Sequence, residues 1–174
     1  MLMRSKARGF TLYEVLIAVL ILAIGILGVT GLQVLSLQQN RSALLRAQAL
    51  QVGNDILDRI RANPDGTYDN IGFDDDPSGS VNCVGATADC SEDEMATYDI
   101  GQWKCSINPH DENGDVYSTC TTLGIAAGNA NALPEGQGAI AVNGDGVHEV
   151  SVRWSDYANP NSPQTTITLR SRAN

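Results

Sequence analysis

The longest apolar stretch of the chain lies near its N-terminus. Residues 15–32 read VLIAVLILAIGILGVTGL, in which Thr30 is the only polar side chain. Extended back to residue 10, the stretch is long enough to cross a hydrocarbon core of about 30 Å as a helix that rises about 1.5 Å per residue. The pattern therefore predicts a membrane-spanning helix over residues 10–35.

The segment that follows is apolar on one side only. Its apolar side chains recur at steps of three or four residues, the spacing of one face of an amphipathic helix. No proline interrupts residues 10–62, and Asn63-Pro64 ends the pattern because the residue before a proline avoids helical ψ angles. We therefore expect one helix over residues 10–62, in which residues 36–62 form a stalk that docks a domain. The apolar positions are Leu45, Ala49, Val52, Ile56 and Ile60.

Residues 63–174 predict a small domain, a head, that begins with a loop and a short helix. Residues 64–82 are rich in Pro, Gly, Asp and Ser, which indicates a loop rather than core. Ser91 with Glu94 three residues later fits a capping box, in which the two side chains satisfy backbone N–H groups at a helix start. A short helix over about residues 92–103 is expected to follow.

The last third of the head predicts three antiparallel strands. Residues 138–142 and 148–154 flank a Gly-rich turn, and residues 165–170 repeat the alternation of apolar and polar positions. This sheet would pack on the apolar stripe of the stalk, so the expected fold class is α+β, a long N-terminal helix on a small antiparallel sheet. The side chains expected to face inward are Val150, Val152, Trp154, Ile167 and Leu169.

Charge is distributed unevenly between the two parts of the chain. The formal charge of the 174 residues is −9, but residues 1–62 carry +4 and residues 63–174 carry −13. An acidic head argues against a nucleic-acid binder, which needs Lys and Arg to neutralise phosphates. Basic side chains at Arg4, Lys6 and Arg8 precede the apolar run, which predicts a cytoplasmic N-terminus and an exported, periplasmic head.

The apolar run can be compared with two ordinary export signals, a cleaved secretory signal and a signal anchor. It is longer than the ~7–15 apolar residues of a cleaved secretory signal. A plain signal anchor remains open on hydropathy alone. Glu14 favours a third interpretation, because a carboxylate in the first turns of a membrane helix is costly unless it is paired or stays near the interface. No Lys or Arg lies between residues 9 and 40, but cleavage after Gly9 would create an α-amino group on Phe10, four residues from Glu14.

The segment GFTLYEV, which begins at Gly9 after a short basic leader, resembles the type IV prepilin signature. The resemblance implies that a prepilin peptidase removes residues 1–9 and N-methylates Phe10. It also implies that Glu14 pairs with the N-terminus of a neighbouring subunit during filament assembly. Tyr13 departs from the pattern, since an aliphatic residue is more usual there.

Further segments resemble the PilV class of minor pilins: AIGILG from residue 23, LQVGNDILDRIRANP from residue 50, residues 90–103, and LPEGQG from residue 133. The resemblance implies a subunit that sits first in the inner membrane and then in the pilus. It implies priming of assembly with other minor pilins, the major pilin and a tip adhesin, in support of attachment and twitching motility. A minor pseudopilin of a type II secretion system stays open, as does a signal-anchored periplasmic binding protein or enzyme.

Four cysteines in an exported head predict disulfides. Three pairings are open, and the sequence-local one, Cys83–Cys90 with Cys105–Cys120, is preferred because it closes two loop-rich stretches. The nested pairing, Cys83–Cys120 with Cys90–Cys105, stays open. A zinc site is disfavoured because the spacings contain no CxxC pair.

The remaining candidate chemistry is incomplete. Asp111-x-Asn113-x-Asp115 has the first spacings of an EF-hand-like calcium loop, but it lacks both the turn glycine and the final Glu, so solvated turns are favoured. No Gly-x-Ser-x-Gly, phosphate loop or metal-spaced His pair occurs, and neither His110 nor His148 has a recognisable nucleophile partner. We therefore expect no enzymatic activity, no cofactor and no metal.

Overall fold

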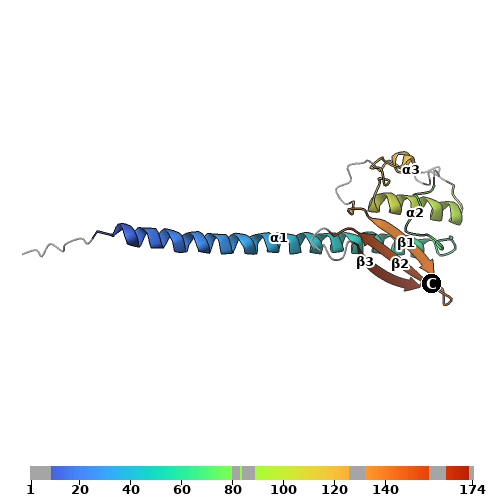
Figure 1. Ribbon diagram of the computed structural model, residues 1–174. Coiled ribbons are helices and arrows are strands. Elements are labelled where there is room, and N and C mark those ends of the chain that lie inside the picture. Colours follow the sequence, from blue (N-terminus) through green and yellow to red (C-terminus); the bar gives the residue numbers. More distant parts are fainter. Residues whose placement is uncertain (1–8, 80–82, 84–88, 126–131, 157–163, 173–174) are drawn as a thin grey trace, which may run out of the picture. The chain divides into compact units, whose positions relative to one another are not determined.

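A computed structural model of the chain describes residues 9–79, 83, 89–125, 132–156 and 164–172. The chain forms two compact units, residues 1–41 and residues 42–174. The helices are α1 (Leu12–Ala62), α2 (Glu92–Ile107) and α3 (Ser118–Thr122), and the strands are β1 (Gln137–Val142), β2 (Val147–Trp154) and β3 (Thr165–Arg172) (Figure 1).

In the first unit, α1 is apolar and exposed. The helix contains a segment long and apolar enough to cross a membrane, and none of that segment is buried within the protein. Single side chains illustrate the exposure, with Leu27 at 73%. An α-helix satisfies its own backbone hydrogen bonds, so such a surface suits lipid or other apolar helices. The helix begins at Leu12, two residues after the predicted start, and ends at Ala62 as expected.

In the second unit, the apolar stripe of α1 forms part of the hydrophobic core. Leu45, Ala49, Ile56 and Ile60 are buried and Val52 is partly buried, as the spacing predicted. Gly53 lies so close to the sheet that an added Cβ would come within 2.6 Å of Leu169. The predicted packing of helix on sheet is confirmed.

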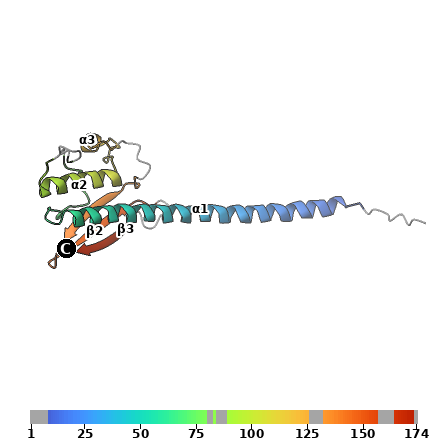
Figure 2. The ribbon, with the colours of Figure 1, turned by 180° about the vertical axis from the view of Figure 1, so that it is seen from behind.

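The sheet has the order β1-β2-β3, and both pairs are antiparallel (Figure 2). The strands run slightly further than predicted, by one residue at the start of β1 and of β2 and by two at the end of β3. The inward positions are confirmed, with Val150, Val152 and Trp154 buried, and Ile167 and Leu169 partly buried against the core.

The second helix packs beside α1 over the β1 side of the sheet. Trp103 is fully buried, and its indole Nε1 donates to the backbone carbonyl of Val52 on α1 at 2.9 Å. Gly138 on β1 is required here, because a Cβ would come within 2.5 Å of the Trp103 ring. The predicted end of this helix near residue 103 is wrong, because α2 runs one more turn to bury Ile107. The capping box of Ser91 and Glu94 is confirmed.

The prediction that residues 64–82 contribute no core is wrong for its described part. Tyr68 is 1% exposed, and its hydroxyl donates to Asp99 at 2.6 Å. Ile71 exchanges backbone hydrogen bonds with Ile140 of β1 at 3.0 and 2.9 Å, which covers that edge of the sheet. The composition of this segment, rich in turn residues, therefore gave no sign of the buried Tyr68 or of the backbone bridge between Ile71 and Ile140.

Both disulfides follow the sequence-local pairing. Cys83 joins Cys90, and Cys105 joins Cys120. The second bond ties α2 to α3, and both of its cysteines are fully buried. The head is thus an α+β domain with disulfide-bonded loops, as predicted.

Candidate functional site

The start of α1 is held by a capping box that the sequence analysis missed. The Glu14 carboxylate accepts hydrogen bonds from the backbone N–H and the hydroxyl of Thr11, both at 3.0 Å. The Thr11 hydroxyl in turn accepts from the backbone N–H of Glu14 at 3.3 Å. The spacing Thr-x-x-Glu, the same signal that identified Ser91 and Glu94, could have revealed it. Glu14 therefore has a local partner in the uncleaved chain.

The bond between Gly9 and Phe10 lies just outside this helix. Both residues are exposed and non-helical, with Phe10 at 88% exposure. No other part of the described chain lies within 4 Å of a Cβ built on Gly9. Within the described residues, the peptide bond between Gly9 and Phe10 is therefore exposed, and Phe10 directly precedes Thr11, the partner of Glu14.

In the head, a charged network joins the end of α1 to α2. Arg59 donates to Asp99 at 2.9 Å and to Gln102 at 2.6 Å through Nη1, and to Asp55 at 3.0 Å through Nε. Asp99 also accepts from Tyr68 and is 6% exposed, so its charge is fully paired. Burial, and then the hydrogen bond to Asp99, raise the pKa of Tyr68. The network holds together α1, α2 and the loop that contains Tyr68.

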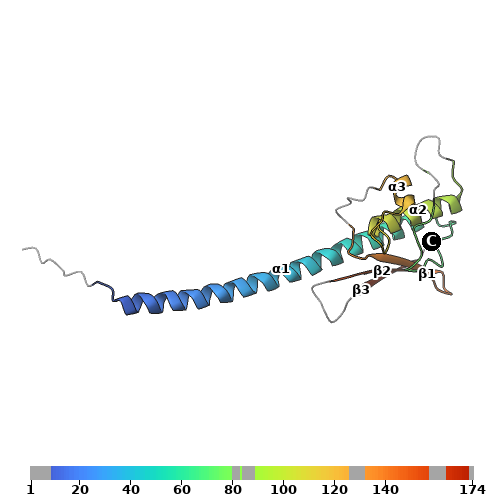
Figure 3. The same ribbon diagram turned by 45° about the horizontal axis from the view of Figure 1, so that its top comes forward.

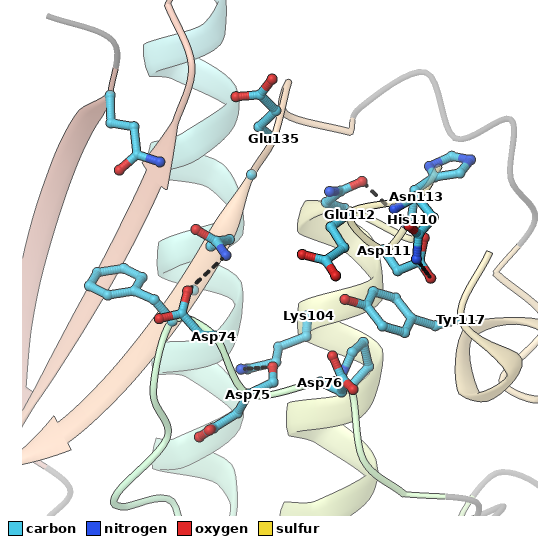
Figure 4. Close-up of a pocket in the computed structure, with 17 residues that line it drawn as sticks. Asp74, Asp75, Asp76, Lys104, His110, Asp111, Glu112, Asn113, Tyr117 and Glu135 are labelled. Carbon is cyan, nitrogen blue, oxygen red and sulfur yellow. Dashed lines mark hydrogen bonds between the residues drawn. The ribbon is translucent and has the colours of Figure 1, made fainter. Parts of the chain in front are cut away.

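A polar pocket of about 790 Å³ opens between α2, the start of β1 and the loops around residues 73–77 and 108–117 (Figure 4). Acidic side chains from two loops line it, among them Asp75, Asp76 and Glu112. Lys104 lies at its base, where its amine donates to the backbone carbonyls of Gly72, at 2.8 Å, and Asp75. Burial lowers the pKa of Lys104, and the neighbouring aspartates oppose that change.

The candidate calcium loop forms a turn closed by its own backbone. The Asp111 carboxylate accepts from the backbone N–H groups of Asn113 and Asp115, both at 2.9 Å. These bonds lower the pKa of Asp111, and the bond from the Asp115 backbone has the largest effect. Over the part of the chain that the structure describes, no group of three or more His, Cys, Asp or Glu side chains is arranged to hold a metal ion.

The two histidines lie in different surroundings. His110 lines the polar pocket, whereas His148 is on β2, where burial lowers its pKa and Asp69 opposes the change. The structure brings neither into a constellation with a nucleophile among the described residues. The polar pocket can accept hydrogen bonds from hydroxyl or cationic groups, and its geometry points to no reaction.

Comparison with known protein families gives two adjoining matches. Residues 4–30 match the prokaryotic N-terminal methylation motif. Residues 31–101 match a family described as type IV pilin Tt1218. Together they cover more than half of the chain. Over residues 4–101 the chain is similar to type IV pilins. No curated protein and no solved structure matches it.

The two matches cover different parts of the chain. The methylation motif contains Gly9, Phe10 and Glu14, and the pilin match contains the stalk and most of α2. Pilins are structural subunits rather than enzymes. The motif implies processing by a prepilin peptidase and assembly with pilins, and the exposed apolar helix is suited to anchor the chain in a membrane. The sheet lies outside both matches.

Proposed function

We propose that this protein is a minor pilin of a type IV pilus, of the PilV class. The observation that carries the proposal is the methylation motif, whose match includes the start of an exposed apolar helix, followed in the chain by a small disulfide-bonded head. In this proposal residues 1–9 are a leader, residues 10–35 cross the bacterial inner membrane, residues 36–62 form the stalk and residues 63–174 form a periplasmic head.

Processing supplies the cation that residues 10–35 lack. Hydrolysis of the bond after Gly9 releases the leader and leaves an amine on Phe10, which the peptidase then methylates. Glu14, whose carboxylate is bound to Thr11 before cleavage, can accept a hydrogen bond from this amine on a neighbouring subunit. At that depth in a membrane an ion pair is favoured over two unpaired charges, because each unpaired charge is costly and water does not compete for the pair.

The subunit then acts in small numbers near the pilus tip. It primes assembly with other minor pilins, the major pilin and a tip adhesin, and the pilus supports attachment and twitching motility. The absence of a helix-breaking proline from residues 10–62 supports an accessory rather than a major subunit.

Incorporation into filaments tests the role of Glu14. Glu14→Gln keeps the size and hydrogen-bonding capacity of the side chain but removes its charge. We expect this variant to stay in the inner membrane and to fall at least about tenfold in the sheared pilus fraction, because a charge-assisted pair is lost. Tyr13→Leu, which restores the aliphatic residue more usual in the family, is the matched control and should be incorporated normally. Equal incorporation of Glu14→Gln and wild type would show that the carboxylate has no assembly role.

A further inference from the structure

The sheet has one covered edge and one open edge. On the β1 side, Ile71 bonds the backbone of Ile140. On the other side, β3 is the outer strand, and within the described residues its backbone bonds only β2 (Figure 3). A strand exposed in this way presents a row of N–H and C=O groups that another chain can pair with.

The usual protections of an edge strand are missing from most of β3. All eight residues pair with β2 in one unbroken register, so no bulge bends the strand away. The strand, TTITLRSR, contains no proline and is rich in β-branched residues at its first half. Only Arg170 and Arg172, near its end, are charged.

The charge of this edge is opposite to that of the head. Residues 63–174 carry seventeen acidic and four basic side chains. Two of the basic ones are occupied elsewhere, since Lys104 is buried and Arg153 pairs with Asp74 at 2.7 Å. The other two, Arg170 and Arg172, are exposed on β3, which contains no acid, although each also has a partner, Arg170 in Glu149 and Arg172 in the backbone carbonyl of Asp145 at 3.2 Å.

The side chains that lie opposite one another on β2 and β3 indicate which side chains a fourth strand would need. On the outer face, Glu149 of β2 lies opposite Arg170 of β3 and pairs with its Nε at 2.9 Å. The Arg170 side chain is 68% exposed, and among the described residues only its Nε is bonded, so the two terminal nitrogens can hold a second carboxylate on the next strand. One row along, the hydroxyls of Ser151 and Thr168 are 3.0 Å apart, so a hydroxyl residue would extend that row.

We propose that the free edge of β3 binds an extended acidic segment of another pilus subunit, which adds a fourth, antiparallel strand. The carboxylates of that segment lie opposite Arg170 and Arg172, and hydroxyl residues lie opposite Thr166 and Thr168. The identity of the partner as a pilus subunit rests on the proposed function, whereas the binding chemistry rests on the sheet alone.

A synthetic peptide tests the binding chemistry with the full chain in detergent micelles. The probe is Asp-Val-Asp-Val-Thr-Val-Thr, and Lys-Val-Lys-Val-Thr-Val-Thr is its charge-reversed control. We expect the acidic peptide alone to bind and to slow the exchange of β3 backbone amides. Arg170→Glu should weaken its binding about tenfold or more, through loss of a charge-assisted contact and gain of repulsion. Arg46→Glu, the same change at an exposed site on α1, should leave it within about twofold.

Three results would overturn the proposal. The first is that neither peptide slows exchange in β3. The second is that Arg170→Glu and Arg46→Glu weaken binding of the acidic peptide equally, which would reflect overall charge rather than a contact at the edge. The third is slowed β3 exchange on raising the concentration of the chain alone, which would make a second copy the occupant. If the chain is processed after Gly9 but does not bind the acidic peptide, this proposal alone is overturned. If the chain binds the acidic peptide but is not processed after Gly9, the proposed function alone is overturned.

Discussion

At the scale of single residues, Asp99 holds the junction between α1 and α2. It is buried, and it receives hydrogen bonds from Arg59 and Tyr68 at 2.9 and 2.6 Å. Asp99→Asn keeps the shape but removes the charge, so we expect the free energy of unfolding to fall by about 2 kcal/mol, the scale of a hydrogen bond to a charged group.

Denaturant unfolding followed by the fluorescence of Trp103 and Trp154 measures this change. Asp55→Asn removes the other carboxylate bound to Arg59, but that side chain is 49% exposed. The control should therefore cost about 0.5 kcal/mol or less. A cost for Asp99→Asn no larger than that of Asp55→Asn would contradict the account of this network.

Glu94 gives the head a dependence on acid pH. Its bonds to the backbone and hydroxyl of Ser91 lower its pKa from 4.5. Because the unfolded chain binds this proton at a higher pH than the folded one, the contribution of Glu94 is present above about pH 5 and is lost as the pH falls through the folded pKa. The slope of stability against pH below 5 should therefore be smaller in Glu94→Gln.

The matched control for this slope is Glu92→Gln. It removes the same charge from the same turn of α2, but within the described structure the Glu92 side chain makes no hydrogen bond. Chemical denaturation at a series of pH values, with each variant compared with wild type, measures the difference. An unchanged slope in Glu94→Gln would show that the capping contact is absent or does not survive in solution.

At the scale of elements, the two disulfides contribute differently. Cys105–Cys120 spans 15 positions and ties α3 to α2, whereas Cys83–Cys90 spans 7. Loop-closure entropy predicts losses of about 3 and about 2 kcal/mol for the two bonds. Replacing Cys105 and Cys120 together by Ala should cost more than replacing Cys83 and Cys90, as measured by thermal unfolding of each variant. The reverse order would show that the shorter loop is the more important one for the head.

Most elements of this fold could be predicted from local signals. The 3.6-residue period gave the stalk, alternation gave the strands, and Ser91 with Glu94 gave the start of α2. The end of α2 at Ile107 had a local signal that the sequence analysis missed, since Asn108-Pro109 repeats the Asn63-Pro64 pattern that ended α1. Tyr68 had no such signal, because its surroundings in a loop gave no hint of the partner Asp99, 31 positions away.

The candidate site was predictable only where it is local in sequence. Gly9, Phe10 and Glu14 form a contiguous motif, so their spacing identified them. The polar pocket and the open edge of β3 bring together residues from distant segments, and their geometry depends on strand order, which alternation alone does not fix.

At the scale of the whole molecule, charge and hydropathy separate three parts with different tasks. The basic side chains of Arg4, Lys6 and Arg8 precede an apolar helix, and the head that follows is acidic. If the leader is removed, the chain changes from −9 to −12, and the head alone carries −13. The uncleaved chain cannot make the proposed ion pair, because its Phe10 nitrogen is an amide.

Cleavage after Gly9 is therefore the central claim of this account, and intact mass with N-terminal sequencing of the protein recovered from its host's pili measures it. The account predicts a chain that begins at Phe10 and is heavier by one methyl group than residues 10–174. A chain in assembled pili that still begins at Met1 would contradict it.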